Sequence, residues 1–242
     1  MPERLVLSTS SISSYLSCHR KYLFSSVYRI SGGQSIAAAL GSAVHAGAEA
    51  FWKSPLRPQK AMRAVWESQL ALVPLPYEEP PEGALADAER MLGTYIGQVA
   101  PTFTPTLIEE PFLITVDGVA LSGVIDAADP ATKEDLHDLK TVSMISKFDP
   151  LSYTLQLSLY SLGYRALTGH KPRKLLLDVL PRRGKVTYRQ VEVQPEIGEL
   201  LDVIGVVRDG IMAEDYSPTG ATGNACKWCS YKAICSYSTE ET

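Results

Sequence analysis

The chain contains only four cysteines, and their positions limit how it can fold. Cys18 lies near the N-terminus, whereas Cys226, Cys229 and Cys235 follow one another near the C-terminus in the pattern C-x2-C-x5-C. Four thiolates can hold one tetrahedral zinc ion or one iron-sulfur cluster, and the close spacing of three of them favours a metal site over unrelated thiols. We therefore expect one metal site to join the two ends of the chain, closing most of it into a loop and stabilising the fold.

Composition predicts a globular protein that works in the cytoplasm. The chain has 242 residues, of which 45% are hydrophobic, enough to bury a substantial core. It has no apolar stretch of about 18 residues, and its first residues lack the zones of a signal peptide. We therefore expect no membrane association. A reducing cytoplasm would also favour metal-bound thiolates over disulfides.

The overall charge is not typical of a protein that binds nucleic acids. The net charge is −4, whereas proteins that bind nucleic acids usually carry a basic surface. Basic residues nevertheless cluster at three places, which are residues 19–21, 171–174 and 182–185. These clusters could line a groove, or they could be ordinary solvated loops.

Hydrophobic periodicity predicts an α/β fold with a central mixed sheet flanked by helices. A first helix follows the N-cap candidates Ser8 to Ser11 and carries Cys18. Helices are expected over residues 36–52, 61–72, 84–99, 151–167 and 195–212, and Gly169 ends the fourth of these. Strands are expected over residues 107–116, 119–128 and 136–141, as an antiparallel meander, and over 175–180 and 186–193.

Two aspartates and a lysine form the clearest chemical pattern in the predicted meander. Asp138 and Lys140 are two residues apart, so a strand points both side chains to one face while Leu139 enters the core. An antiparallel neighbour can bring Asp126 beside them. Carboxylates held this close repel one another, and either a raised pKa or a divalent cation relieves the repulsion.

Other residues could complete this site. His45 and Glu49 share one face of the helix over residues 36–52, and Gln156 and Tyr160 share a face of the helix after the meander. Glu109 or Glu110 could approach a metal from the first strand, although solvent-facing carboxylates are the usual case. Tyr160 could also simply fill the core.

Taken in order, these motifs resemble the RecB-type branch of the PD-(D/E)XK nuclease superfamily. The resemblance spans residues 8–237 and rests on Gly41 to His45, Gly123 to Asp126, Asp138 to Thr141, Gln156 to Tyr160 and the cysteines. It is closest to the iron-sulfur members, which include CRISPR-adaptation exonucleases, the AddB nuclease domain and stand-alone phage relatives. No helicase motif accompanies it.

The resemblance implies a role for each matching residue. His45, Asp126, Asp138 and the Leu139 carbonyl would bind Mg²⁺ or Mn²⁺, Lys140 would be the catalytic lysine, and Gln156 and Tyr160 would support the site and contact DNA. Cys18, Cys226, Cys229 and Cys235 would hold a 4Fe-4S cluster, and zinc is the alternative that the spacing leaves open.

The resemblance also implies an organisation and an activity. We expect a single nuclease domain over residues 1–242, with N-terminal helices (8–55), a helical insertion (56–104), the nuclease core (105–193) and a C-terminal helix with the cysteine clip (194–242). The expected activity is metal-dependent hydrolysis of DNA, as single strands or duplex ends, most simply by an exonuclease of recombination, repair or CRISPR-type processing. Expected protein partners are recombination, helicase or CRISPR-adaptation proteins. The alternative is a non-catalytic or partner-dependent DNA-binding subunit that keeps the fold.

Overall fold

The structure is a computed structural model that describes residues 5–54, 57–75, 79–219, 226 and 229–238. The chain divides into two compact units, each assembled from segments far apart in sequence. Unit 1 comprises Met1–Gly33, Leu113–Ser122 and Ile197–Thr242, and unit 2 comprises Gln34–Phe112 and Gly123–Glu196. The single domain expected from the sequence stays a prediction.

Strands of mixed direction form the centre of unit 2. Strands β4 (Asp135–Val142) and β5 (Lys174–Pro181) run parallel, and β6 (Arg189–Val193) runs antiparallel to β5. The end of β3 (Val119–Asp129) pairs antiparallel with the start of β4, and β2 (Leu107–Val116) pairs with β3. The expected α/β fold with a mixed sheet is therefore confirmed, although β6 begins later than predicted.

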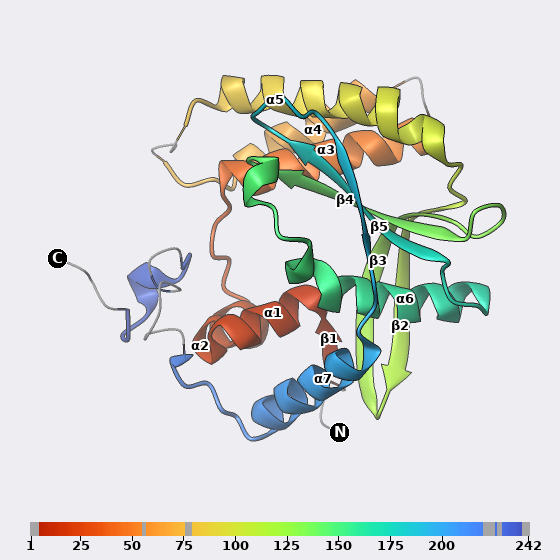
Figure 1. The fold of residues 1–242 in the computed structure, drawn as a ribbon. Coiled ribbons are helices and arrows are strands. Elements are labelled where there is room, and N and C mark those ends of the chain that lie inside the picture. The colour runs from red at the N-terminus through yellow and green to blue at the C-terminus, as the bar shows by residue number, and fades with distance from the viewer. Residues whose placement is uncertain (1–4, 55–56, 76–78, 220–225, 227–228, 239–242) are drawn as a thin grey trace. The chain divides into compact units, whose positions relative to one another are not determined.

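Three helices form a layer along β4 and β5 in unit 2 (Figure 1). They are α3 (Ile36–Lys53), α4 (Pro58–Leu70) and α5 (Pro81–Thr94). Small residues let them approach closely, because a Cβ atom on Gly47 of α3 would lie 2.7 Å from a methyl carbon of Leu92 on α5. The layer buries Ala127, Leu139 and Leu180 of the three neighbouring strands. This arrangement brings α3 against the strand that carries Lys140.

Helix α6 (Thr154–Thr168) packs against Phe112 of β2, whose ring lies beside Gly163 of α6 and Gly123 of β3. A Cβ atom on either Gly123 or Gly163 would lie 2.5 Å from the ring of Phe112, so neither position has room for a side chain. The Phe112 ring then meets Tyr160 edge to face, with centroids 6.0 Å apart. The predicted end of this helix is confirmed, since Gly169 has a φ of 83°.

Unit 1 contains β1 (Val6–Ser8), α1 (Thr9–Ser17), α2 (His19–Tyr22) and α7 (Ile197–Met212). The expected N-cap is confirmed at Ser8, which forms a capping box with Ser11. The expected continuous first helix is wrong, because Cys18 has extended backbone angles that separate α1 from α2. Strand β1 pairs parallel with residues 120–122 of β3 and was not predicted, since three residues are too few to show a period.

The described helices include none that is both long and apolar enough to cross a membrane.

Candidate active site

A cleft of about 500 Å³ opens in unit 2 beside the end of β4 that carries Lys140. Helix α3, strand β2 and strand β4 each contribute to its walls. Its lining residues are Gly41, Ser42, His45, Ala46, Glu49, Glu109, Leu139, Lys140 and Thr141. Gly41 allows α3 to approach β4 closely, because a Cβ atom there would lie 3.1 Å from Thr141 Oγ1. The cleft therefore gathers three of the predicted site residues, which are His45, Leu139 and Lys140.

The register of β3 and β4 brings the two predicted aspartates together. Ala127 pairs with His137, so the next antiparallel pair places Asp126 opposite Asp138. Asp126 Oδ2 accepts a hydrogen bond of 2.8 Å from the Leu139 backbone N–H. This bond holds the Asp126 carboxylate in place through the Leu139 backbone amide.

Lys140 lies between Asp138 and an aromatic ring. Its Nζ atom is 2.7 Å from Asp138 Oδ2 and 5.1 Å from the ring centroid of Tyr153. The Tyr153 ring stacks on Phe148, with centroids 5.5 Å apart. The ammonium group is thus held by charge on one side and by a ring face on the other.

Asp138 is a completely buried carboxylate, with 0% of its side chain exposed. Its Oδ1 atom has no hydrogen-bond partner among the residues that the structure describes. Burying a carboxylate oxygen without a partner is costly. An additional positive ligand at this oxygen would remove that cost.

His45 and Glu109 lie close to Asp126. Its Nδ1 atom lies 3.5 Å from Asp126 Oδ2 and 3.8 Å from Glu109 Oε1. One donor atom from each of these three residues lies within 4.8 Å of the other two. Ligands of one divalent cation are separated by similar distances, since each lies about 2.0–2.6 Å from the ion. One cation could therefore bind all three.

Glu109 reaches the site through an unusual backbone conformation. Its φ is 47°, in the left-handed region that non-glycine residues rarely adopt. The sequence motifs do not select Glu109, and the run Ile108-Glu109-Glu110 gives no signal that separates the two glutamates. Of the two glutamates that could approach a metal, the structure therefore places Glu109 beside His45 and Asp126.

The close packing of charges changes the pKa values of the site. Burial alone would lower the pKa of His45, but the Asp126 and Glu109 carboxylates outweigh it and raise that pKa to about 9. Burial, together with the Asp126 charge, raises the pKa of Asp138 to about 6 although Lys140 opposes the shift. Burial likewise raises the pKa of Asp126. The metal-free site therefore retains protons that a cation would displace.

Gln156 and Tyr160 lie one turn apart on α6 and contact each other. Gln156 Nε2 donates a hydrogen bond of 2.9 Å to Tyr160 Oη. The Tyr160 side chain is buried, and burial with the charges of Asp126 and Asp138 raises its pKa to about 12. Tyr160 therefore fills core space and also lies near the acidic site. The two predictions for this residue, a core residue and a support of the site, are compatible.

A comparison with known protein families identifies the superfamily of this chain. A sequence profile of the PD-(D/E)XK nuclease superfamily matches residues 6–236. The chain belongs to this superfamily. No curated protein sequence matches it. Among solved structures, a candidate exonuclease from Eubacterium rectale aligns with a TM-score of 0.64 at 13% identity, over 86% of this chain and 79% of that one. The protein SSO0001 aligns with a TM-score of 0.52 at 15% identity, over 99% and 90%. Identities this low show a shared fold alone.

The PD-(D/E)XK site has a buried polar support that the sequence did not reveal. Asp178 accepts hydrogen bonds from Tyr188 Oη at 2.8 Å and Gln190 Nε2 at 2.9 Å, and its Oδ2 atom lies 2.7 Å from His137 Nδ1. The His137 ring stacks on Phe103, with centroids 3.7 Å apart. A small cavity is lined by both members of this pair and by His45 and Asp126. The network therefore links β4 and β5 beside His45 and Asp126.

The four cysteines of this superfamily member all belong to unit 1, and each is partly buried. Cys18 caps the start of α2, and the Cys229 backbone N–H donates to the Cys226 carbonyl. Within the described ranges, the only three metal-binding side chains gathered within 4.8 Å are those of His45, Glu109 and Asp126. The predicted joining of the four cysteines by a metal cluster stays a prediction.

Proposed function

We propose that the chain is a divalent-metal-dependent nuclease that hydrolyses DNA phosphodiester bonds. The observation that carries this proposal is the buried Asp138 carboxylate, which has one oxygen on Lys140 and one without a partner. It lies opposite Asp126, which is grouped with His45 and Glu109. Oxygen and imidazole ligands of this kind suit Mg²⁺ or Mn²⁺.

Each residue of the site would have a distinct role. His45, Asp126, Asp138 and the Leu139 carbonyl, with Glu109 in addition, would hold the cation. A bound divalent cation lowers the pKa of water and offsets negative charge on a phosphate. Lys140 would donate a hydrogen bond to the phosphate oxygens as their charge increases. Gln156 would contact the DNA, while Tyr160 supports the site from α6.

We further propose exonuclease action and a 4Fe-4S cluster on the four cysteines. Both rest on the resemblance of the ordered motifs to iron-sulfur nucleases of the RecB type. The cluster would close unit 1 by drawing Cys18 to the C-terminal cysteines. Roles in recombination, repair or CRISPR-type processing, and a recombination, helicase or CRISPR-adaptation partner, belong to the same proposal.

Digestion of end-labelled linear DNA and closed circular DNA tests this function. The reaction is run without oxygen, with Mg²⁺ or Mn²⁺, using wild-type protein and the Asp138→Ala variant. Shortening of linear DNA alone, lost in the variant, is expected for an exonuclease. Cleavage of the circle would instead identify an endonuclease. Tight DNA binding without any product would favour the alternative of a non-catalytic or partner-dependent subunit.

A further inference from the structure

The turn that follows β5 carries basic residues that the metal site does not use. We call residues 182–185 the basic turn; it contains Arg182, Arg183 and Lys185. The Arg182 backbone N–H donates to the Val142 carbonyl at 2.8 Å, and the Arg183 N–H donates to the Ser143 carbonyl at 3.0 Å. The basic turn therefore lies beside the segment that directly follows Lys140 along the chain.

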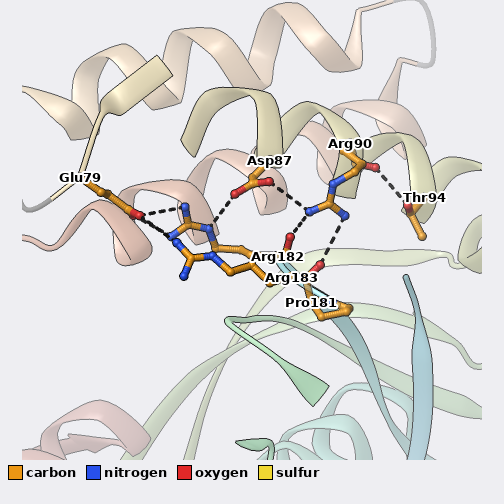
Figure 2. Close-up of polar contacts among 7 residues, drawn as sticks. All are labelled: Glu79, Asp87, Arg90, Thr94, Pro181, Arg182 and Arg183. Atoms are coloured by element: carbon orange, nitrogen blue, oxygen red, sulfur yellow. Dashed lines mark hydrogen bonds and ion pairs between the residues drawn. The ribbon is translucent and has the colours of Figure 1, made fainter. Parts of the chain in front are cut away.

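Arg182 holds the basic turn to the layer of helices in unit 2, as Figure 2 shows. Its guanidinium group binds both oxygens of Glu79, at 2.7 and 3.2 Å, and Asp87 Oδ2 at 3.1 Å. Only 11% of its side chain is exposed. The charge of Arg182 is therefore used inside the protein, so the sequence-based idea that the whole cluster lines a groove is wrong for this residue.

Arg90 fixes the backbone at the same place. It donates hydrogen bonds to the carbonyls of Pro181 and Arg182, at the end of β5, and to Asp87 Oδ1 at 3.2 Å. Gly184, at the tip of the basic turn, has a φ of 110°, which side chains with a Cβ atom rarely allow. The backbone at the start of the turn is thus fixed by α5, whose Asp87 binds Arg182 and whose Arg90 binds the carbonyls of Pro181 and Arg182 (Figure 2).

Arg183 and Lys185 remain available to a ligand. The Arg183 side chain is 69% exposed, and its only ionic contact in the described part of the chain is Glu79 Oε2 at 3.6 Å. Such an exposed ion pair is worth about 0–1 kcal/mol. Three arginines (90, 182 and 183) share two carboxylates here. Among the residues that the structure describes, one of these three arginine charges has no carboxylate of its own, and the exposed Lys185 adds a further positive charge.

We propose that Arg183 and Lys185 bind the phosphate backbone of the DNA strand as it leaves the cleft. The inference rests on the proposed nuclease function and names part of its substrate-binding surface. Ligands of open α/β sheets lie beyond the carboxyl ends of the parallel strands, and the basic turn lies at that end of β4 and β5. Two or three strand residues, at roughly 3.3 Å each, separate the basic turn from Lys140. That distance corresponds to about two or three nucleotides along one DNA strand.

The opposite end of β5 offers a matched control. Lys171 is exposed, and Lys174 lies 3.4 Å from Glu192, much as Lys185 is exposed and Arg183 lies near Glu79. The two pairs carry the same charge but lie at the two ends of one strand. A general effect of net charge would therefore appear equally in variants of either pair.

The experiment measures the affinity for labelled single-stranded and blunt duplex DNA as a function of salt, by fluorescence anisotropy without added divalent cation. Each lost phosphate contact lowers the slope of log K against log salt by about 0.7–0.9. We expect the Arg183→Ala/Lys185→Ala variant to lose about 1.4–1.8 of the slope and to bind about tenfold more weakly. The exchange variant Arg183→Lys/Lys185→Arg should retain the wild-type slope.

Equal slopes for wild type and the Arg183→Ala/Lys185→Ala variant, or the same loss in the Lys171→Ala/Lys174→Ala control, would overturn the inference. The proposed function would survive that result if wild-type protein still cleaves DNA with Mg²⁺. Failure of wild-type protein both to bind and to cleave DNA would overturn the proposed function and the inference together. Thermal melting of each variant shows that the fold is kept.

Discussion

Binding of a divalent cation should depend steeply on pH, because His45 holds a proton that the cation must displace. The carboxylates of Asp126 and Glu109 raise the pKa of His45 to about 9, against the opposing effect of burial. Its Nδ1 atom is the one that lies near both carboxylates. A protonated ring nitrogen cannot bind a metal ion. Metal binding at neutral pH should therefore release one proton from His45.

The pKa of about 9 for His45 gives the size of the effect. At pH 7 only about 1% of the rings are deprotonated, so competition weakens metal binding by about 100-fold, or about 2.7 kcal/mol. Apparent affinity should rise about tenfold per pH unit from about pH 6.5 to 9. Below about pH 6 Asp138 also takes up a proton, so the dependence becomes steeper. In the metal-free protein, the His45 shift stabilises the fold below pH 6.5, and this stabilisation is lost as the pH rises through about 9.

Calorimetric titration with Mn²⁺ in two buffers of different ionisation enthalpy measures the protons released. Wild-type protein at pH 7.5 should release about one proton per ion, and the His45→Ala variant should release close to none. His170 is exposed, so His170→Ala should behave as wild type. A proton count near zero in wild type, or equal counts in wild type and His45→Ala, would refute the reasoning.

Three further variants test individual contacts. Glu109→Gln should weaken Mn²⁺ binding about tenfold by removing a charged ligand, while the neighbouring Glu110→Gln should change it little; equal effects would exclude Glu109 as a ligand. Tyr153→Leu should lower kcat about fivefold at unchanged KM, because the ring that holds Lys140 is lost, and Tyr153→Phe should retain kcat; loss in both would point to the hydroxyl group. Asp178→Ala leaves the buried His137 Nδ1 and the half-buried Tyr188 hydroxyl group without their acceptor, so it should lower the free energy of unfolding by about 1–3 kcal/mol and lower Tm by about 5 °C in thermal melts; an unchanged Tm would contradict this.

Local patterns in the sequence predict much of the fold. Ser8 is a good N-cap, Gly169 ends a helix, and the two-residue spacing of Asp138 and Lys140 places both on one face of a strand. Each of these features depends on residues within one turn or two strand positions. That short range is why sequence alone was sufficient.

Contacts between distant segments could not be predicted in the same way. The left-handed backbone that turns Glu109 toward His45 leaves no mark in residue type. The His137 and Asp178 pair depends on the register of two parallel strands. Likewise, the sequence does not show that Arg182 is paired, because its carboxylate partners, Glu79 and Asp87, are distant in the chain.

Cleavage of a labelled oligonucleotide under single-turnover conditions tests the central claim most directly. Wild-type protein is compared, with and without Mg²⁺, with Asp138→Asn and with Asp202→Asn, which makes the same chemical change at an exposed residue of α7. We predict cleavage that needs Mg²⁺, is lost in Asp138→Asn and is retained in Asp202→Asn, while all three proteins bind DNA equally. Cleavage by Asp138→Asn at the wild-type rate would contradict the account.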